Sequence, residues 1–280
     1  MNTSFLLGIL LGMTAALMLN IGKGVQKQKV HVLLQGWRMF TPAHRGDLGV
    51  WLLGLALTAG AGVPFSFGLK FSESASMISA MTGIGLIGLA IYAVKVIGEN
   101  LSTGDGIGIA LVVVGTSLIA YLGAGEETRI RVFDDKQLIL TVLPMLAAAA
   151  AACLTALKIR RIHGVVFGAS AGLCLGLTLF LGDAALLRAG GSILGQFSNP
   201  YSYAAIAFAI LTTFVTQVGF LRGRALEVVP AINSTVILTP ILFEIAIYRI
   251  YPEGATLLLI PMIVIGVVLI SRGAAARVAA

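Results

Sequence analysis

Long apolar runs, separated by short polar stretches, dominate the chain, and sustained alternation of the strand type is absent. An apolar helix of about 20 residues spans the hydrocarbon core of a bilayer, about 30 Å thick, with its backbone N–H and C=O groups paired internally. The pattern therefore predicts an all-α integral membrane protein with nine transmembrane helices. We expect these helices near residues 5–22, 48–69, 74–96, 106–123, 137–157, 164–187, 201–221, 226–248 and 255–271.

The composition also indicates a membrane protein. Hydrophobic residues make up 58% of the chain and charged residues 11%, with a mean hydropathy of +0.99, whereas soluble domains carry roughly a quarter charged residues. The formal charge of +7 does not indicate nucleic acid, because such a surface needs basic residues clustered on a water-facing domain. We therefore expect the lipid bilayer, and no nucleic acid, as a partner.

The distribution of Lys and Arg predicts the orientation, because positive loops are retained on the cytoplasmic side. With the N-terminus outside and residues 23–47 as a basic cytoplasmic loop, 13 of the 19 Lys and Arg residues lie inside. If residues 24–47 instead cross the membrane as a tenth helix, the bias falls to 10 against 9. We therefore expect a cytoplasmic C-terminus in a cytoplasmic (inner) membrane, with the ten-helix arrangement left open.

A pair of helices occurs twice along the chain. The segment Leu86–Tyr92 reads LIGLAIY and Leu242–Tyr248 reads LFEIAIY, so Leu, Ala, Ile and Tyr recur at identical spacing. Glu99 follows the first copy and Glu253 the second, and an apolar run built around one glycine comes after each. The copies begin with the third and eighth predicted helices, which cross the membrane in opposite directions. This pattern predicts two inverted structural repeats, which are typical of secondary transporters.

The repeat also predicts the organisation of the chain. We expect a first helical repeat of four helices, a charged linker and a second helical repeat of five helices, at residues 1–123, 124–136 and 137–280.

One stretch resembles a known family. Residues Val96–Ile119, with the pair Gly98 and Glu99, are similar to the signature of the drug/metabolite transporter superfamily, in which a Gly-Glu pair precedes a glycine-bearing final helix. Gly108 and Gly115 stand where the helix glycines of that family usually fall. The resemblance implies the EamA-like fold of two inverted repeats and transport by alternating access.

Within that superfamily, the chain is most similar to the NIPA-type magnesium transporters, which also have nine helices. The similar features are lysines at the end of the first helix, Trp51 in the second helix, and a late stretch with Gln217, Asn233 and Pro240. This resemblance implies a magnesium or other divalent-cation substrate as an alternative to a polar metabolite.

Two carboxylates inside predicted helices are candidates for coupling a cation or a proton, because charges inside a bilayer are costly and mark functional sites. Asp183 lies near the outer end of the sixth predicted helix, and Glu244 lies near the outer end of the eighth. Both could face one outward vestibule. The structural alternative places them at headgroup level beside Arg188 and Arg249.

Neutral polar residues in three helices are candidates for binding the solute. Their three- and four-residue spacing puts them on shared helix faces, where they would line a cavity between the two bundles. As an alternative, Ser and Thr serve as hydrogen-bond partners between helices. The candidate residues are Ser76, Ser79, Thr213, Thr216, Gln217, Asn233, Thr235 and Thr239.

Other motifs have structural interpretations. Gly83, Gly85 and Gly88 match a dinucleotide-binding fingerprint, but the match lies inside a predicted transmembrane helix without the strand that the fingerprint requires. Three glycines, Gly168, Gly172 and Gly176, form a stripe that predicts close helix packing. The two cysteines lie inside apolar runs and suit packing.

Catalytic and metal-binding patterns are missing from the sequence. His31, His44 and His163 fall in predicted loops without metal-ligand spacing, and no P-loop or Ser-His-Asp arrangement is visible. We therefore predict no enzyme, no cofactor and no metal centre.

Together these patterns favour a secondary transporter of a small polar solute. The alternatives are a divalent-cation transporter and a membrane scaffold that transports nothing, and a homodimer or a membrane-protein partner stays open.

Overall fold

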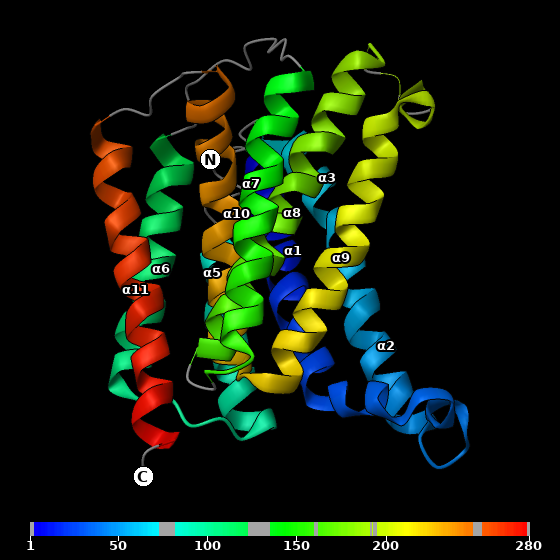
Figure 1. The fold of residues 1–280 in the computed structure, drawn as a ribbon, viewed down its shortest axis with the longest axis vertical. Helices are drawn as coiled ribbons and strands as arrows, with labels where there is room; N and C mark the ends of the chain where they lie inside the picture. Colours follow the sequence, from blue (N-terminus) through cyan, green and yellow to red (C-terminus); the bar gives the residue numbers. More distant parts are fainter. Residues whose placement is uncertain are drawn as a thin grey trace.

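A computed structural model describes residues 3–72, 82–122, 135–159, 162–190, 192, 195–248 and 254–278, and these residues are helical without strands. The helices of the first part are α1 (Thr3–Lys29), η1 (Val30–Phe40), α2 (Arg45–Gly60), α3 (Gly62–Ser72), α5 (Thr82–Tyr92), η2 (Ala93–Ile97) and α6 (Thr103–Leu122). Those of the second part are α7 (Asp135–Ala156), α8 (His163–Arg188), η5 (Gly195–Ser198), α9 (Pro200–Arg222), α10 (Ala225–Tyr248) and α11 (Gly254–Val278). We call the helices before residue 123 the first half and those after residue 134 the second half (Figure 1).

The helices form a membrane protein. Among the described residues, six helices are long and apolar enough to cross a bilayer, and three shorter apolar helices accompany them. Large apolar side chains face outward along these helices, including Leu140 on α7, Phe214 on α9 and Leu258 on α11. Contiguous apolar surface of this kind is costly in water, so lipid surrounds these faces. The described helices overlap the expected ranges, but the expected helix at 48–69 is divided into α2 and α3, and the start of the helix expected at 74–96 lies outside the described residues.

The first helix is longer than the sequence predicts. The apolar run ends near Gly22, but α1 continues through the basic segment to Lys29, so the expected loop begins later than residue 23. Lys23, expected in a cytoplasmic loop, is only 5% exposed within α1. The extension is stable because cations near the C-terminus of a helix interact favourably with its dipole, and because the side chains of this segment find partners on other helices.

A short 3-10 segment, η1, follows α1, and Gly36 turns the chain within it at φ 54°. Trp37 is 88% exposed there. The helices on either side, α1 and α2, are antiparallel neighbours, because Gly22 lies against Thr58 and Gly54 lies against the backbone of Gln26. The segment between them therefore connects two adjacent helix ends on one side of the bundle.

In the first half, α1 packs against α2, α3 and α5. Gly85 of α5 lies against Ala16 and Asn20 of α1, whereas Gly24 of α1 lies against Tyr92 near the end of α5. The contacts advance along both helices together, so α1 and α5 run parallel. Two helices can approach each other this closely only where small residues lie at their crossing.

In the second half, α8 packs against α9 and α10. The predicted glycine stripe lies at the contact with α10: Gly168 meets Val228 and Gly172 meets Ile232. Gly176 lies against Thr239 further along, so α8 and α10 run parallel. This confirms the packing role expected for the stripe. His163, expected in a loop, instead begins α8 and is buried, because the helix starts where α9 and α10 cover its first turn.

The two halves meet along α6 and α11, which stand side by side in Figure 1. Gly108 of α6 lies against Gly266 and Ile270 of α11, whereas Gly115 lies against Met262 and Ile263. The contacts run in opposite directions along the two helices, so α6 and α11 are antiparallel. A hydrophobic core continues between the halves through residues of α5, α6, α10 and α11, including Leu89, Val112, Ile232 and Ile270.

Candidate functional site

Three polar side chains of α1 face the interior of the protein at three-residue spacing. Asn20 is 0% exposed, Lys23 5% and Gln26 3%. Spacing of three or four residues places side chains on one face of a helix, and here that face packs between α2, α9 and α10. A polar stripe this deep in a membrane protein needs partners on the other helices.

At Asn20 and Lys23, this stripe of polar side chains contacts α10. The amide Nδ2 of Asn233 donates to Oδ1 of Asn20 at 2.8 Å, and the amide Nδ2 of Asn20 donates to the backbone carbonyl of Ala16 at 3.0 Å. The ammonium of Lys23 lies 3.5 Å from Oδ1 of Asn233. The two contacts of Asn233 join residues more than 200 positions apart and connect the first half to the second.

At Gln26, the same stripe of α1 contacts α2 and α9. The amide Nε2 of Gln217 donates to Oε1 of Gln26 at 2.6 Å, and the indole N–H of Trp51 donates to Oε1 of Gln217 at 3.1 Å. The amide Nε2 of Gln26 donates to the hydroxyl of Thr58 at 2.9 Å and to the carbonyl of Gly54 at 3.2 Å. Each amide is thus oriented by a neighbour.

We call these side chains the central polar cluster: Asn20, Lys23, Gln26, Trp51, Thr58, Gln217 and Asn233. They come from α1 and α2 of the first half and from α9 and α10 of the second. The cluster contains neutral donors and acceptors with one cation. A few convergent polar groups in apolar surroundings are typical of a small-molecule site.

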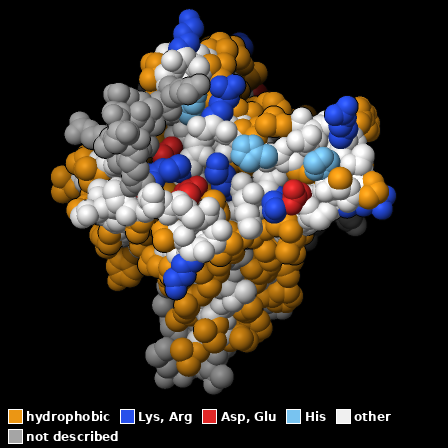
Figure 2. All heavy atoms as spheres, turned by 90° about the horizontal axis from the view of Figure 1, so that it is seen from below, with side chains coloured by type: hydrophobic (Ala, Val, Ile, Leu, Met, Phe, Trp, Pro, Cys, Tyr) orange, Lys and Arg blue, Asp and Glu red, His pale blue; other side chains and the backbone are white. Residues whose placement is uncertain are grey.

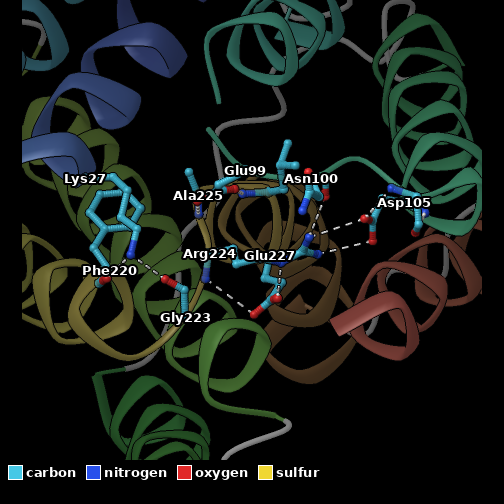
Figure 3. Close-up of polar contacts among 11 residues, drawn as sticks. Lys27, Glu99, Asn100, Asp105, Phe220, Gly223, Arg224, Ala225 and Glu227 are labelled. Atoms are coloured by element: carbon cyan, nitrogen blue, oxygen red, sulfur yellow. Dashed lines mark hydrogen bonds and ion pairs between the residues drawn. The ribbon is translucent and has the colours of Figure 1, made fainter. Parts of the chain in front are cut away.

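A second polar group joins the halves at the end of the bundle where α1 and α9 finish (Figure 3). We call it the basic-end network, and its first contact involves Lys27. The ammonium of Lys27 donates to the carbonyl of Gly223 at 2.7 Å and to that of Phe220. Phe220 belongs to the last turn of α9 and Gly223 caps its end, where backbone acceptors lack helical partners.

Arg224, between α9 and α10, lies at the centre of the network (Figure 3). Its guanidinium donates to Glu227 at 2.6 Å and to the carbonyl of Asn100 at 2.9 Å. It also donates to both carboxylate oxygens of Asp105 at 3.2 and 3.3 Å. Although burial opposes it, hydrogen bonding to Glu227 and Asp105 raises the pKa of Arg224.

Asp105 is held by its own helix terminus. Its carboxylate accepts from the backbone N–H of Ser102 at 2.9 Å, and its backbone N–H donates to the Ser102 hydroxyl at 3.1 Å. This reciprocal arrangement is a capping box at the start of α6. The carboxylate of Asp105, held in this position, accepts hydrogen bonds from Arg224 of the second half.

Glu99 closes the network by capping α10. Its two carboxylate oxygens accept from the backbone N–H groups of Ala225 at 2.6 Å and Leu226 at 3.1 Å, where the helix dipole favours an anion. Burial nevertheless raises the pKa of Glu99, against the opposing effects of these hydrogen bonds and of the charges of Lys27 and Arg224.

The backbone before Glu99 explains its position. The helix α5 widens into the π-helical turn η2, and Gly98 then adopts the left-handed conformation with φ 80°. The backbone N–H of Glu99 donates to the carbonyl of Ala93 at 2.9 Å. Glycine is favoured at such a C-terminal position. The Gly-Glu pair singled out in the sequence therefore turns the chain and presents a carboxylate to the other half.

The network lies at an end of the protein that carries many basic residues. Figure 2 views this end and shows Lys and Arg side chains gathered on it, with apolar side chains on the flanks. The helix ends that meet there contribute Lys27, Lys29, Arg38, Arg45, Lys95, Arg222 and Arg224.

The structure brings two of the predicted solute-binding residues, Gln217 and Asn233, into the central polar cluster. Thr213 and Thr216 lie on the same helix as Gln217, and the hydroxyl of Thr213 donates to the carbonyl of Ala209 at 3.1 Å.

The threonines of α10 lie elsewhere. Thr235 and Thr239 pack against Gly172 and Gly176 of α8, and their hydroxyls donate to carbonyls one turn back on α10.

Four other predicted residues cannot be placed in the site. Ser76 and Ser79 lie outside the described residues. Asp183 belongs to α8 and Glu244 to α10, but their side chains lie outside the described part.

Most of the α1 contribution to the cluster was not predicted from the sequence. The signal was the spacing of Asn20, Lys23 and Gln26, but the lysine-rich segment was interpreted as a loop. Trp51 and Thr58 gave no periodic signal, and only the packing of α2 on α1 shows that they face the cluster.

Comparison of the chain with protein-family models, with curated proteins and with solved structures gives no match.

Proposed function

We propose that this protein is a secondary transporter of a small polar solute, working by alternating access between its two halves. The observation that carries the proposal is the central polar cluster. Its hydrogen-bonding side chains lie inside membrane-spanning helices and come from both halves. Polar residues inside a bilayer are expensive and mark substrate pathways, and transporters bind their substrates between their two repeats.

The helix pairing supports two inverted repeats. In the first half α1 packs on α2 and α5, and in the second half α8 packs on α9 and α10. Lys27, at the end of α1, contacts Gly223, which in turn lies against Gly164 at the start of α8. The helices α1 and α8 therefore run in opposite directions. Likewise Glu99, which follows α5, contacts the beginning of α10. The helices α5 and α10 therefore also run in opposite directions.

The basic-end network supports alternating access. Its contacts between Lys27 and Gly223, between Glu99 and α10, and between Asp105 and Arg224 all connect the first half to the second at the same end. The positive-inside rule makes this end cytoplasmic. In our proposal the protein lies in an inner membrane with its C-terminus inside, and the described conformation is closed toward the cytoplasm.

Cysteine accessibility tests the proposal without knowledge of the substrate. In a background with Cys153→Ala and Cys174→Ala, Thr58→Cys places a thiol in the central polar cluster. We expect a membrane-impermeant maleimide to label it from the outer side. Adding Arg224→Gln should weaken the basic-end network and allow labelling from the cytoplasmic side in inverted vesicles.

The lipid-facing substitution Ile210→Cys is the control, because Ile210 is 66% exposed on α9 and should react from neither side. Absence of labelling at position 58 from both sides would contradict transport and favour the scaffold alternative. If position 58 is labelled from the outer side alone even after Arg224→Gln is added, the result would contradict alternating access.

The divalent-cation alternative receives no support from the cluster. It contains Lys23 and no carboxylate, whereas hard cations are held by oxygen ligands that are often carboxylates.

A further inference from the structure

Lys23 differs from the neighbouring lysines of α1 in what its ammonium contacts. Lys27 donates to two carbonyls, and Lys29 lies 2.5 Å from the carboxylate of Asp47. Lys23 is more deeply buried than either, yet its contact among the described residues is a single amide oxygen of Asn233 at 3.5 Å. That distance is at the limit for a hydrogen bond.

A buried ammonium without a counter-ion is energetically unfavourable. Transfer of an ammonium into a low-dielectric interior costs several kcal/mol unless an opposite charge or several hydrogen bonds compensate it. Lys23 offers three N–H donors and has one distant acceptor. No carboxylate of the described part forms an ion pair with it. The position thus has unused capacity for an acceptor.

The surroundings of Lys23 suit an anion. The neighbouring side chains Asn20 and Asn233 carry amide groups, and Gln26 lies one turn along the same face of α1. Asn233 is only partly buried, and its amide contacts both Asn20 and Lys23. A carboxylate or phosphate oxygen placed beside Lys23 would receive a charge-assisted hydrogen bond, which is roughly twice as strong as a neutral one.

We infer that the solute of the central polar cluster is a small organic or inorganic anion whose carboxylate or phosphate group binds Lys23. This inference rests on the proposed transport function and narrows its substrate class. It places the cation of the site on the protein and the negative charge on the solute, which is the reverse of a magnesium transporter.

Charge-selective labelling tests this inference. In the background with Cys153→Ala and Cys174→Ala, Asn233→Cys places a thiol beside Lys23. The probes are 2-sulfonatoethyl methanethiosulfonate, an anion, and the 2-trimethylammonioethyl reagent, a cation. The ratio of the two reaction rates at this thiol is divided by the same ratio for a free thiol in solution. With Lys23 in place, we expect the anion to react about tenfold faster, because a fixed cation raises the local concentration of anions.

Three variants identify the source of the selectivity. Lys23→Gln should bring the corrected ratio close to one, and Lys23→Arg should retain the preference for the anion. Lys29→Gln removes a cation of the same helix that is already paired with Asp47, and it should leave the ratio unchanged. Lys23→Arg also keeps the test informative if Lys23→Gln fails to fold.

The outcomes separate this inference from the proposed function. Equal reaction of both probes, or faster reaction of the cation, would overturn the anionic substrate and leave transport standing. A preference for the anion that persists in Lys23→Gln would also overturn it. If neither probe reaches the thiol introduced by Asn233→Cys, no aqueous solute enters the cluster, and the transport proposal itself fails.

Discussion

Arg224 and Asp105 form a two-point contact between the halves of the protein, although they are 119 positions apart. The Asp105 side chain is 0% exposed and that of Arg224 is 21% exposed. A planar guanidinium can hold both oxygens of a carboxylate at once, which fixes the start of α6 relative to the start of α10. The relationship connects local capping at one helix to the contact between the two halves at this end of the bundle.

Removing Arg224 should destabilise this end of the protein. Arg224→Gln leaves the buried Asp105 without its cation, and loss of one partner from a buried pair costs about 3 kcal/mol. We expect a lower unfolding free energy in detergent micelles. The double variant Arg224→Gln, Asp105→Asn should lose less than the sum of the two single losses.

The control for this prediction is Arg188→Gln. Arg188 pairs with Asp135 at 2.7 Å, but both side chains are exposed, so the loss should be much smaller than for Arg224→Gln. Equal losses for Arg224→Gln and Arg188→Gln would contradict a special role of the basic-end network.

Close contact between α6 and α11 should depend on the absence of a side chain at Gly108. A Cβ at this position would lie 2.6 Å from the carbonyl oxygen of Gly266, so Gly108→Ala must push the helices apart and should cost about 1–3 kcal/mol. Gly106→Ala on the same helix meets nothing within 4 Å and should be neutral or slightly stabilising. Thermal unfolding of the two variants side by side measures the difference.

The turn at Gly98 should tolerate asparagine better than valine. With φ at 80°, a β-branched residue is strained by about 1–3 kcal/mol, whereas asparagine enters the left-handed region more readily. Strain at this position should also displace Glu99 from the start of α10. Similar unfolding free energies for Gly98→Val and Gly98→Asn would show that the turn does not position the carboxylate.

Glu99 should contribute a pH dependence to stability. Burial raises its pKa in the folded protein, so the folded state holds the proton more tightly than the unfolded state does. Below the unfolded value both states are protonated, and above the raised folded value both are ionised, with the folded state then less stable. Stability due to Glu99 should therefore fall as the pH rises through its folded pKa.

The comparison of wild type with Glu99→Gln isolates this contribution, because other titrating groups largely cancel in the difference. We expect the unfolding free energy of the wild type, relative to the variant, to fall as the pH rises from the ordinary carboxyl range through the raised pKa of Glu99. A difference that is flat with pH, or that rises, would refute a raised pKa.

Much of the helical organisation could be predicted from the sequence, because an apolar run of membrane length has few alternatives to a helix. The ends of α8, α9 and α10 agree with the pattern to within one or two residues. The end of α1 was wrong because hydropathy marks where lipid-compatible sequence stops and not where the helix stops. Lys23 and Gln26 are polar, yet partners on other helices keep them inside.

The candidate site could be predicted only in part. Gln217 and Asn233 stood out as amides within apolar runs, and the glycine stripe of α8 predicted a close partner. Nothing local indicated that α10 is that partner, or that Asn233 meets Asn20. Likewise the Gly98–Glu99 pair was visible as a motif, but its role as a cap on another helix depends on a contact between Glu99 and Ala225, 126 positions apart.

By itself the sequence determined that the chain is a helical membrane protein, because lipid requires that backbone polar groups be paired within apolar segments. The tertiary structure decided which buried polar side chains meet and which cations have partners. A hydrogen bond needs two groups within about 3 Å, and for groups 191 to 213 residues apart only the packing of α1 against α9 and α10 brings them to that distance.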